Sequence, residues 1–168
     1  MSQQASVTAS PPVMQLSDII QADRIMVDRS GALPTKAEAL RALATLLATA
    51  VTAAEDEVLT LLLEREQLQS TGIGDGVAIP HSALEHAEGQ AGALLLFPKG
   101  IDFDAIDGQP VHIVFGVVGP KRATGEHLRT LARISRLLRD EATRKLLANA
   151  ETPEAAFELI LSHDATTK

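Results

Sequence analysis

The sequence predicts a single α/β domain in which helices cover both faces of a β-sheet. Short apolar runs rich in β-branched residues alternate with longer stretches whose leucines recur at helical spacing. A length of 168 residues suits one domain, because two domains would each have a marginal core. Aromatic residues make up only 2% of the chain, so aliphatic side chains must build that core.

The first half of the domain is expected to hold one short strand and two helices. The strand is predicted at residues 25–27. Thr35 and Glu38 form a capping-box pattern, in which the Thr oxygen accepts an orphan amide while Glu reaches back. A helix over about 36–50 follows. A second helix over 55–68 has acidic residues in its first turn, where the helix dipole favours them.

The second half is expected to hold two strands and three helices. Residues 93–97 form a short apolar run, and residues 111–118 are β-branched and nearly continuous, as in a strand covered on both faces. Asp107-Gly108 is a turn signal between them. The helical patterns then occupy three segments: 125–138, 141–150, and 153 to about 161, where Pro153 opens the last one.

Composition and chain ends narrow the possible functions. Residues 1–13 predict a flexible N-terminal tail, 14–163 the domain and 164–168 a C-terminal tail. No secretory signal or membrane-span pattern is present, so a cytoplasmic location without membrane insertion is expected. The net charge of −7 argues against nucleic acid as a partner. Without cysteine, the chain has no thiolate nucleophile or thiolate metal ligand.

A glycine-rich segment, residues 70–81, is the sharpest feature of the sequence. Gly72, Gly74 and Gly76 make a flexible backbone that can offer amides to an anion. The dinucleotide fingerprint G-x-G-x-x-G requires glycine at position 77, where this chain has Val77, and a P-loop fails as well. The segment therefore matches neither of these two nucleotide-binding motifs.

His81 ends this segment and is the first candidate for chemistry. Pro80 fixes its own φ and restricts Ile79, so the backbone that presents the imidazole is stiffer than a typical loop. Imidazole has an unperturbed pKa near ~6.5, so its neutral form is available to attack phosphorus at neutral pH. The alternative interpretation is a turn that carries an incidental histidine.

Two further residues are candidates, each with an alternative. His127 lies in the first turn of the 125–138 helix, where a helix N-terminus favours a phosphate, but it also continues the apolar stripe and so fits a structural core histidine. The Arg65 guanidinium suits a phosphoryl group, but also an ordinary surface ion pair. The spacing of His81 and His86 matches no metal motif, so neither a metal nor another cofactor is expected.

The stretch from Leu62 to His81 reads L-x-x-R-E-x-x-x-S-T-G-I-G-x-G-V-A-I-P-H. It resembles the active-site segment of the fructose/mannitol class of enzyme IIA, a component of the bacterial phosphoenolpyruvate:sugar phosphotransferase system. Residues 103–115 and 126–128 match the same class in the expected order, and the similarity covers roughly residues 16–162. One departure is Ser82, because the family often has glycine directly after the histidine.

The resemblance implies a mixed β-sheet flanked by helices on both faces, an enzyme IIA type-2 domain. It implies that His81 is phosphorylated, through Nε2, with His127 as the second active-site histidine and Arg65 as the neighbouring cation. The donor would be a histidine-containing phosphocarrier protein, and no metal is implied. Five further residues are expected to support the phosphoryl group: Ser70, Thr71, Gly72, Gly74 and Gly76.

Three roles remain open on the sequence. A nitrogen-related enzyme IIA regulates target proteins according to its phosphorylation state, whereas a fructose/mannitol permease component passes the phosphoryl group to an enzyme IIB. The S-T-G-I-G-x-G motif at residues 70–76 favours the nitrogen-related type. The third role is a protein-binding module that never accepts phosphate. The presence of Arg65, His81 and His127 together argues against that module.

Overall fold

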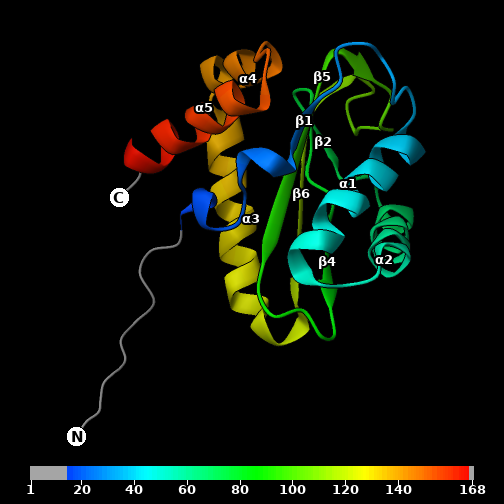
Figure 1. Cartoon of the computed structure of the whole chain (residues 1–168). Coiled ribbons are helices and arrows are strands. Elements are labelled where there is room, and N and C mark those ends of the chain that lie inside the picture. The colour runs from blue at the N-terminus through cyan, green and yellow to red at the C-terminus, as the bar shows by residue number, and fades with distance from the viewer. Residues whose placement is uncertain (1–14, 167–168) are drawn as a thin grey trace, which may run out of the picture.

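The computed structural model describes residues 15–166, so the predicted tail over 1–13 lies outside the described residues. The fold has three layers, with the sheet between two groups of helices (Figure 1). On one face lie α1 (Lys36–Val51) and α2 (Glu55–Leu68). On the other face lie α3 (Thr124–Arg139), α4 (Glu141–Ala148) and α5 (Pro153–Thr166). The predicted α/β class with helices on both faces is confirmed.

The sheet is mixed, as the resemblance implies. Its strands are β1 (Ile25–Val27), β2 (Gly72–Gly74), β3 (Val77–Ala78), β4 (His81–Leu84), β5 (Ala91–Ile101) and β6 (Val111–Pro120). The order is β1-β5-β6-β3-β2, with β5 and β6 antiparallel and β3 parallel to β6. Strand β4 also pairs with β6 in parallel, at β6 residues beyond those that pair with β3.

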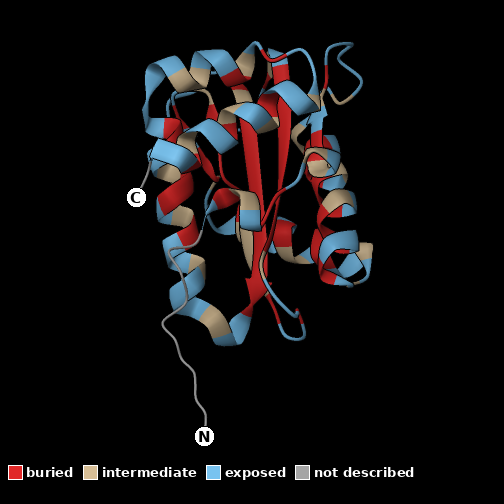
Figure 2. Cartoon of the chain, turned by 60° about the vertical axis from the view of Figure 1, so that its left-hand side comes forward, coloured by how far each residue is buried: buried red, intermediate tan, exposed pale blue. Residues whose placement is uncertain are grey.

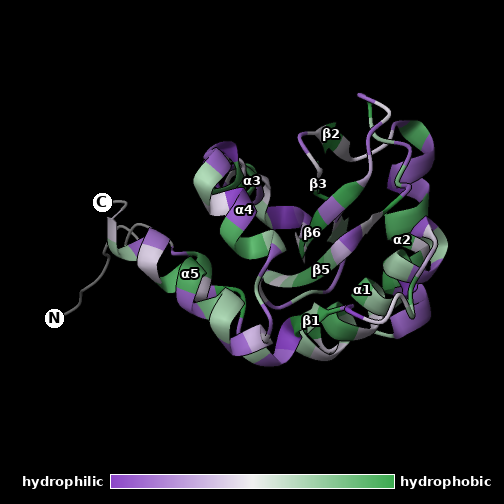
Figure 3. Ribbon diagram, turned by 90° about the horizontal axis from the view of Figure 1, so that it is seen from above, coloured by the Kyte–Doolittle hydropathy of each residue, from purple (hydrophilic) through white to green (hydrophobic). Residues whose placement is uncertain are grey.

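Strand β6 separates two hydrophobic cores. Val114 and Val118 belong to the core beneath α1 and α2, whereas Ile113, Phe115 and Val117 belong to the core beneath α3, α4 and α5. Successive side chains of a strand point to opposite faces, so a strand with helices on both sides must be apolar throughout. Figure 2 shows this buried centre, and Figure 3 shows polar residues on the outer surfaces of the helices.

Helix α1 begins with half of the predicted capping box. The Thr35 hydroxyl oxygen accepts a hydrogen bond from the Glu38 amide at 3.1 Å, as predicted. The Glu38 carboxylate, however, accepts from the Thr35 hydroxyl at 2.9 Å. The short side-chain contact takes the place of the bond to the Thr35 amide that the full motif requires.

Strand β5 and helix α5 extend furthest beyond their predicted ends. Strand β5 continues past residue 97 to Ile101 because the pairing shifts register, and the shift accommodates Pro98 and a left-handed Gly100 (φ 76°). Helix α5 continues to Thr166, so the C-terminal tail predicted at 164–168 is wrong for its first three residues. Asp164 is buried there because its carboxylate accepts backbone hydrogen bonds from residues 16 and 17.

Candidate active site

The glycine-rich segment folds into a tight hairpin. Strands β2 and β3 pair antiparallel around Asp75 and Gly76, which both have positive φ (58° and 76°). Gly72 is required for a different reason, because a Cβ there would lie 2.8 Å from the Cα of Ala105. The flexible turn that the sequence predicts is therefore a pair of short strands at one side of the sheet, with β2 at the edge. Backbone conformation explains Gly76 and the close approach of Ala105 explains Gly72.

His81 lies at the first position of β4 instead of in a loop. The segment between β3 and β4 runs alongside β6, where the Pro80 carbonyl accepts a hydrogen bond from the Val117 amide at 3.0 Å. The Ile79 amide donates to the Thr71 carbonyl at 3.0 Å. Hydrogen bonds on both sides thus hold the backbone that presents the imidazole.

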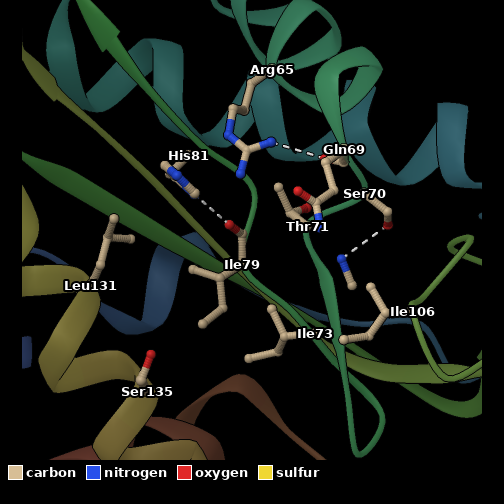
Figure 4. A pocket seen from close by; sticks show the side chains of 11 residues that line it. Arg65, Gln69, Ser70, Thr71, Ile73, Ile79, His81, Ile106, Leu131 and Ser135 are labelled. Carbon is tan, nitrogen blue, oxygen red and sulfur yellow. Dashed lines mark hydrogen bonds between the residues drawn. The ribbon is translucent and has the colours of Figure 1, made fainter.

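A second contact determines which ring nitrogen of His81 carries the proton. Nδ1 lies 2.7 Å from the Ile79 carbonyl oxygen (Figure 4). A carbonyl oxygen only accepts hydrogen bonds, so Nδ1 must be the protonated nitrogen of the neutral ring. Nε2 then keeps its lone pair and is the nucleophilic atom of the side chain.

An open pocket of about 310 Å³ adjoins His81. Its lining combines the polar residues Arg65, Gln69, Ser70, Thr71, His81 and Ser135 with apolar side chains such as Ile79 and Leu131. The Arg65 guanidinium donates to the Gln69 carbonyl at 2.9 Å and reaches the pocket from α2 (Figure 4). Within residues 15–166, no carboxylate lies at ion-pair distance from Arg65, so the alternative of an ordinary surface ion pair does not describe it.

His127 approaches His81 from the first turn of α3. The two ring centroids are 5.8 Å apart and the rings are tilted by 50°. Nδ1 of His127 is buried and has no hydrogen-bond partner within the described part of the chain, unlike a satisfied core histidine. Burial lowers the pKa of His127 below 6.5, and the nearby His81 lowers it further. At neutral pH the ring is therefore predominantly uncharged.

The five predicted supporting residues divide into two groups. Ser70, Thr71 and Gly72 line the pocket, whereas Gly74 and Gly76 are absent from its lining. The amides of Thr71 and Gly72 already donate within the chain, to the Glu66 carboxylate and to the Ser70 hydroxyl. The structure therefore gives no support to the expectation that the Thr71 and Gly72 amides bind the phosphoryl group. The same holds for Gly74 and Gly76.

Glu66 is the residue that sequence reasoning missed. It is only 8% exposed, and its carboxylate holds Thr71 on one side and Lys36 on the other. The available signal was its spacing, because Leu59, Leu62 and Glu66 follow one another at i, i+3 and i+7 on the buried face of α2. A carboxylate on an apolar stripe requires a partner, which the sequence did not identify.

Ser82, the departure from the family pattern, lies away from the imidazole. It follows His81 in β4 and pairs with Val118, whose side chain belongs to the core beneath α1 and α2. His81 pairs with Val117, which belongs to the opposite core. Because strand side chains alternate between faces, the hydroxyl of Ser82 is on the other side of the sheet from the His81 ring.

Among residues 15–166, no three His, Asp or Glu side chains gather as a metal ion would require. No helix in the same range has both the length and the apolar character needed to cross a membrane.

Comparison with known proteins gives a consistent result. The family model described as "Phosphoenolpyruvate-dependent sugar phosphotransferase system, EIIA 2" matches residues 18–163. A nitrogen regulatory protein of Bradyrhizobium diazoefficiens is 36% identical over 153 residues, which cover 91% of this chain and 99% of that protein. The fructose-specific EIIABC component of Bacillus subtilis is 41% identical over 103 residues, 61% of this chain but only 16% of that protein.

Solved structures agree with this assignment. The crystal structure of the nitrogen regulatory protein IIA-Ntr from Neisseria meningitidis superposes with a TM-score of 0.79 at 29% identity, covering 86% of this chain and 98% of that one. The IIA mannitol structure from Escherichia coli, at 23% identity and a TM-score of 0.70, shares the fold. The match over residues 18–163 and the relatives that align along nearly their whole length show that this chain belongs to the enzyme IIA type-2 family of the phosphoenolpyruvate-dependent sugar phosphotransferase system.

Proposed function

We propose that the protein is a phosphoryl carrier that accepts a phosphoryl group on His81 Nε2 from a histidine-containing phosphocarrier protein. One observation carries this proposal: the 2.7 Å contact between Nδ1 and the Ile79 carbonyl leaves the Nε2 lone pair free. In the reaction, that lone pair forms the new N–P bond while the N–P bond of the donor phosphohistidine breaks and its electrons return to the donor nitrogen. The Ile79 carbonyl then stabilises the positive charge that phosphorylation places on the ring.

The neighbouring side chains suit the charge of a transferring phosphoryl group. Phosphoryl transfer depends on alignment and on stabilising the negative charge spread over the equatorial oxygens. Arg65 brings a cation to the pocket, and α3 directs its N-terminal end and His127 toward the same region. In our proposal, Arg65 neutralises the phosphoryl oxygens and His127 contacts them as a neutral hydrogen-bonding partner.

Exposed apolar side chains around the site suit docking of a protein donor. Ile73 and Ile106 line the pocket with 49% and 67% of their surface exposed. Leu128, next to His127, is 61% exposed. Large apolar residues that gather on a surface commonly mark a protein interface. A solved relative at 22% identity is described as a complex of enzyme IIA and phosphorylated enzyme IIB for mannitol, which is consistent with such docking.

For the downstream role we propose a nitrogen-related regulatory enzyme IIA, whose acceptors are regulated target proteins. Its support is the alignment with proteins named nitrogen regulatory protein, which reaches 99% of the Bradyrhizobium diazoefficiens protein and 96% of the Pseudomonas aeruginosa one. The second candidate is a fructose-type permease component that phosphorylates an enzyme IIB, and the 41% identity with the Bacillus subtilis fructose component supports it.

Phosphorylation by a reconstituted donor chain tests the first proposal. The protein is incubated with enzyme I, the phosphocarrier protein and phosphoenolpyruvate, and we expect an acid-labile mass gain of one phosphoryl group. His81→Ala should abolish that gain. His112→Ala is the matched control, because this histidine bonds the Phe97 carbonyl away from the pocket and should not affect labelling. Labelling of His81→Ala equal to that of the natural protein would contradict the assignment.

A second step separates the two downstream roles. The phosphorylated protein is mixed with a fructose-type enzyme IIB, and the phosphoryl group on each protein is followed by mass spectrometry. We expect the group to remain on His81, as a regulatory enzyme IIA requires. Rapid transfer to the enzyme IIB would instead support the permease role.

A further inference from the structure

Glu66 is a buried anion whose hydrogen bonds all lead toward the site. Both oxygens of its carboxylate accept from the Thr71 amide, at 3.2 and 3.0 Å, and Oε1 also accepts from the Thr71 hydroxyl. Lys36 Nζ lies 2.7 Å from Oε2. A buried carboxylate is costly unless its charge is paired and its lone pairs are used, and Glu66 satisfies both conditions.

Lys36 is itself held from several directions. It is the first residue of α1, its Nζ lies 5.0 Å from the centre of the Phe103 ring, and Asp104 contributes a second carboxylate at 3.5 Å. The ammonium therefore connects the start of α1, the end of α2 and the loop after β5. The Glu66 carboxylate, at 2.7 Å, lies nearer to the ammonium than the Asp104 carboxylate does.

A continuous series of hydrogen bonds runs from Glu66 to the imidazole. Glu66 holds the Thr71 amide and hydroxyl, and the Thr71 carbonyl accepts from the Ile79 amide at 3.0 Å. The carbonyl of the same residue, Ile79, holds Nδ1 of His81. Thr71 is only 3% exposed and directly precedes β2, the three-residue strand at the edge of the sheet, so the bonds from Glu66 hold the chain where it enters that strand.

We propose that Glu66 is a positioning residue for His81. Its carboxylate, paired with Lys36, holds Thr71 so that the Ile79 carbonyl keeps the proton on Nδ1 and leaves Nε2 unprotonated. The consequence for phosphoryl transfer rests on the proposed function, but the protonation of the His81 ring is measurable without any donor. A carboxylate is needed because glutamine offers one acceptor oxygen and would direct an amide N–H₂ at a donor.

Long-range ¹H–¹⁵N NMR of ¹⁵N-labelled protein at neutral pH tests the proposal. In the natural protein we expect the Nδ1-protonated tautomer of His81. In Glu66→Gln we expect a mixture of the two tautomers and a loss of about tenfold or more in the rate of phosphorylation, since small misplacements of a reacting group have such effects. Glu64→Gln is the matched control, because it removes the same charge from an exposed position of the same helix. It should leave tautomer and rate unchanged.

The outcomes distinguish the two proposals. An unchanged His81 tautomer in folded Glu66→Gln, or an equal change in Glu64→Gln, would overturn the positioning role even if phosphorylation slowed. If Glu66→Gln does not fold, Thr71→Val removes one bond to the carboxylate with little change of shape. It should shift the tautomer in the same direction, and an unshifted tautomer overturns the role. Failure of the natural protein to accept phosphate would contradict the proposed function alone.

Discussion

His81 and His127 face each other as an imidazole pair with different surroundings. His81 has a fixed hydrogen bond to a backbone carbonyl, whereas Nδ1 of His127 is buried without a hydrogen-bond partner in the described chain. Burial is the larger cause of the lowered pKa of His127, and repulsion from His81 is the smaller one. At neutral pH His127 therefore adds no positive charge beside the His81 ring.

The two causes predict the effect of removing one of them. His81→Ala removes the repulsion but leaves most of the burial, so the pKa of His127 should rise and still remain below 6.5. A titration of the His127 ring protons by ¹H NMR measures this. His81→Phe is the control for burial, because it removes the charge while keeping a ring beside His127. The pKa of His127 should rise in this variant too. A pKa of His127 that is unchanged or above 6.5 in His81→Ala would contradict the assigned causes.

The same lowered pKa makes stability depend on pH. Between the pKa of folded His127 and the unfolded value of ~6.5, the unfolded chain binds more protons than the native protein. The free energy of unfolding should therefore decrease as the pH falls through that window. Burial also lowers the pKa of His163, which adds to the slope in the same direction.

At the scale of single elements, Gly116 determines how closely α1 packs on the sheet. A Cβ at this position would lie 2.4 Å from Cδ2 of Leu43, a fully buried side chain of α1. Such a distance forces the leucine or the strand to move. The glycine therefore interrupts the β-branched run of β6 for a packing reason and needs no role in a turn.

Gly116→Ala should destabilise the protein by about 1–3 kcal/mol, the usual cost of overpacking a core. In a Leu43→Ala background the new methyl group would occupy vacated space, so the same change should cost less. Urea unfolding of the four proteins measures the difference. Gly89→Ala is the control, because nothing lies within 4 Å of its Cβ position. Equal costs of Gly116→Ala in both backgrounds would show that Leu43 is not the obstacle.

At the scale of the whole molecule, Asp164 joins the two ends of the described chain. It is 3% exposed near the end of α5, and its two oxygens accept from the amides of Leu16 and Ser17 at 3.0 Å each. These bonds cap the 3₁₀ turn Leu16–Asp18 against the C-terminal helix. They connect residues 148 and 147 positions apart in the sequence.

Asp164→Ala should lower the free energy of unfolding by about 1–3 kcal/mol, because one buried and one partly buried amide lose a charged acceptor. Asp164→Asn keeps one acceptor oxygen and should cost less. Chemical denaturation followed by circular dichroism gives both values. Glu158→Ala, an exposed change on the same helix, should stay within about 0.5 kcal/mol of the natural protein. A loss in Asp164→Ala no larger than this control would contradict the role of the carboxylate.

Most of the element pattern could be predicted from the sequence. Helical spacing of leucines located α1 and α2 to within one residue, and the continuous apolar run located β6. The short strands β2, β3 and β4 could not be predicted in this way, since each has at most four residues and their glycines are typical of a turn. Strands β3 and β4 form by pairing with β6 residues that lie more than thirty positions later, and β2 in turn pairs with β3.

The sequence by itself determined the family, the candidate histidines and the arginine, because a local motif and helical periodicity preserve that information along the chain. Only the tertiary structure decided how they act together. The tautomer of His81 depends on the Ile79 carbonyl, and the low pKa of His127 depends on burial. The buried Glu66 carboxylate depends on the ammonium of Lys36, thirty residues earlier, to pair its charge. Burial and hydrogen bonding of this kind arise between segments that are distant in sequence, so no local pattern encodes them.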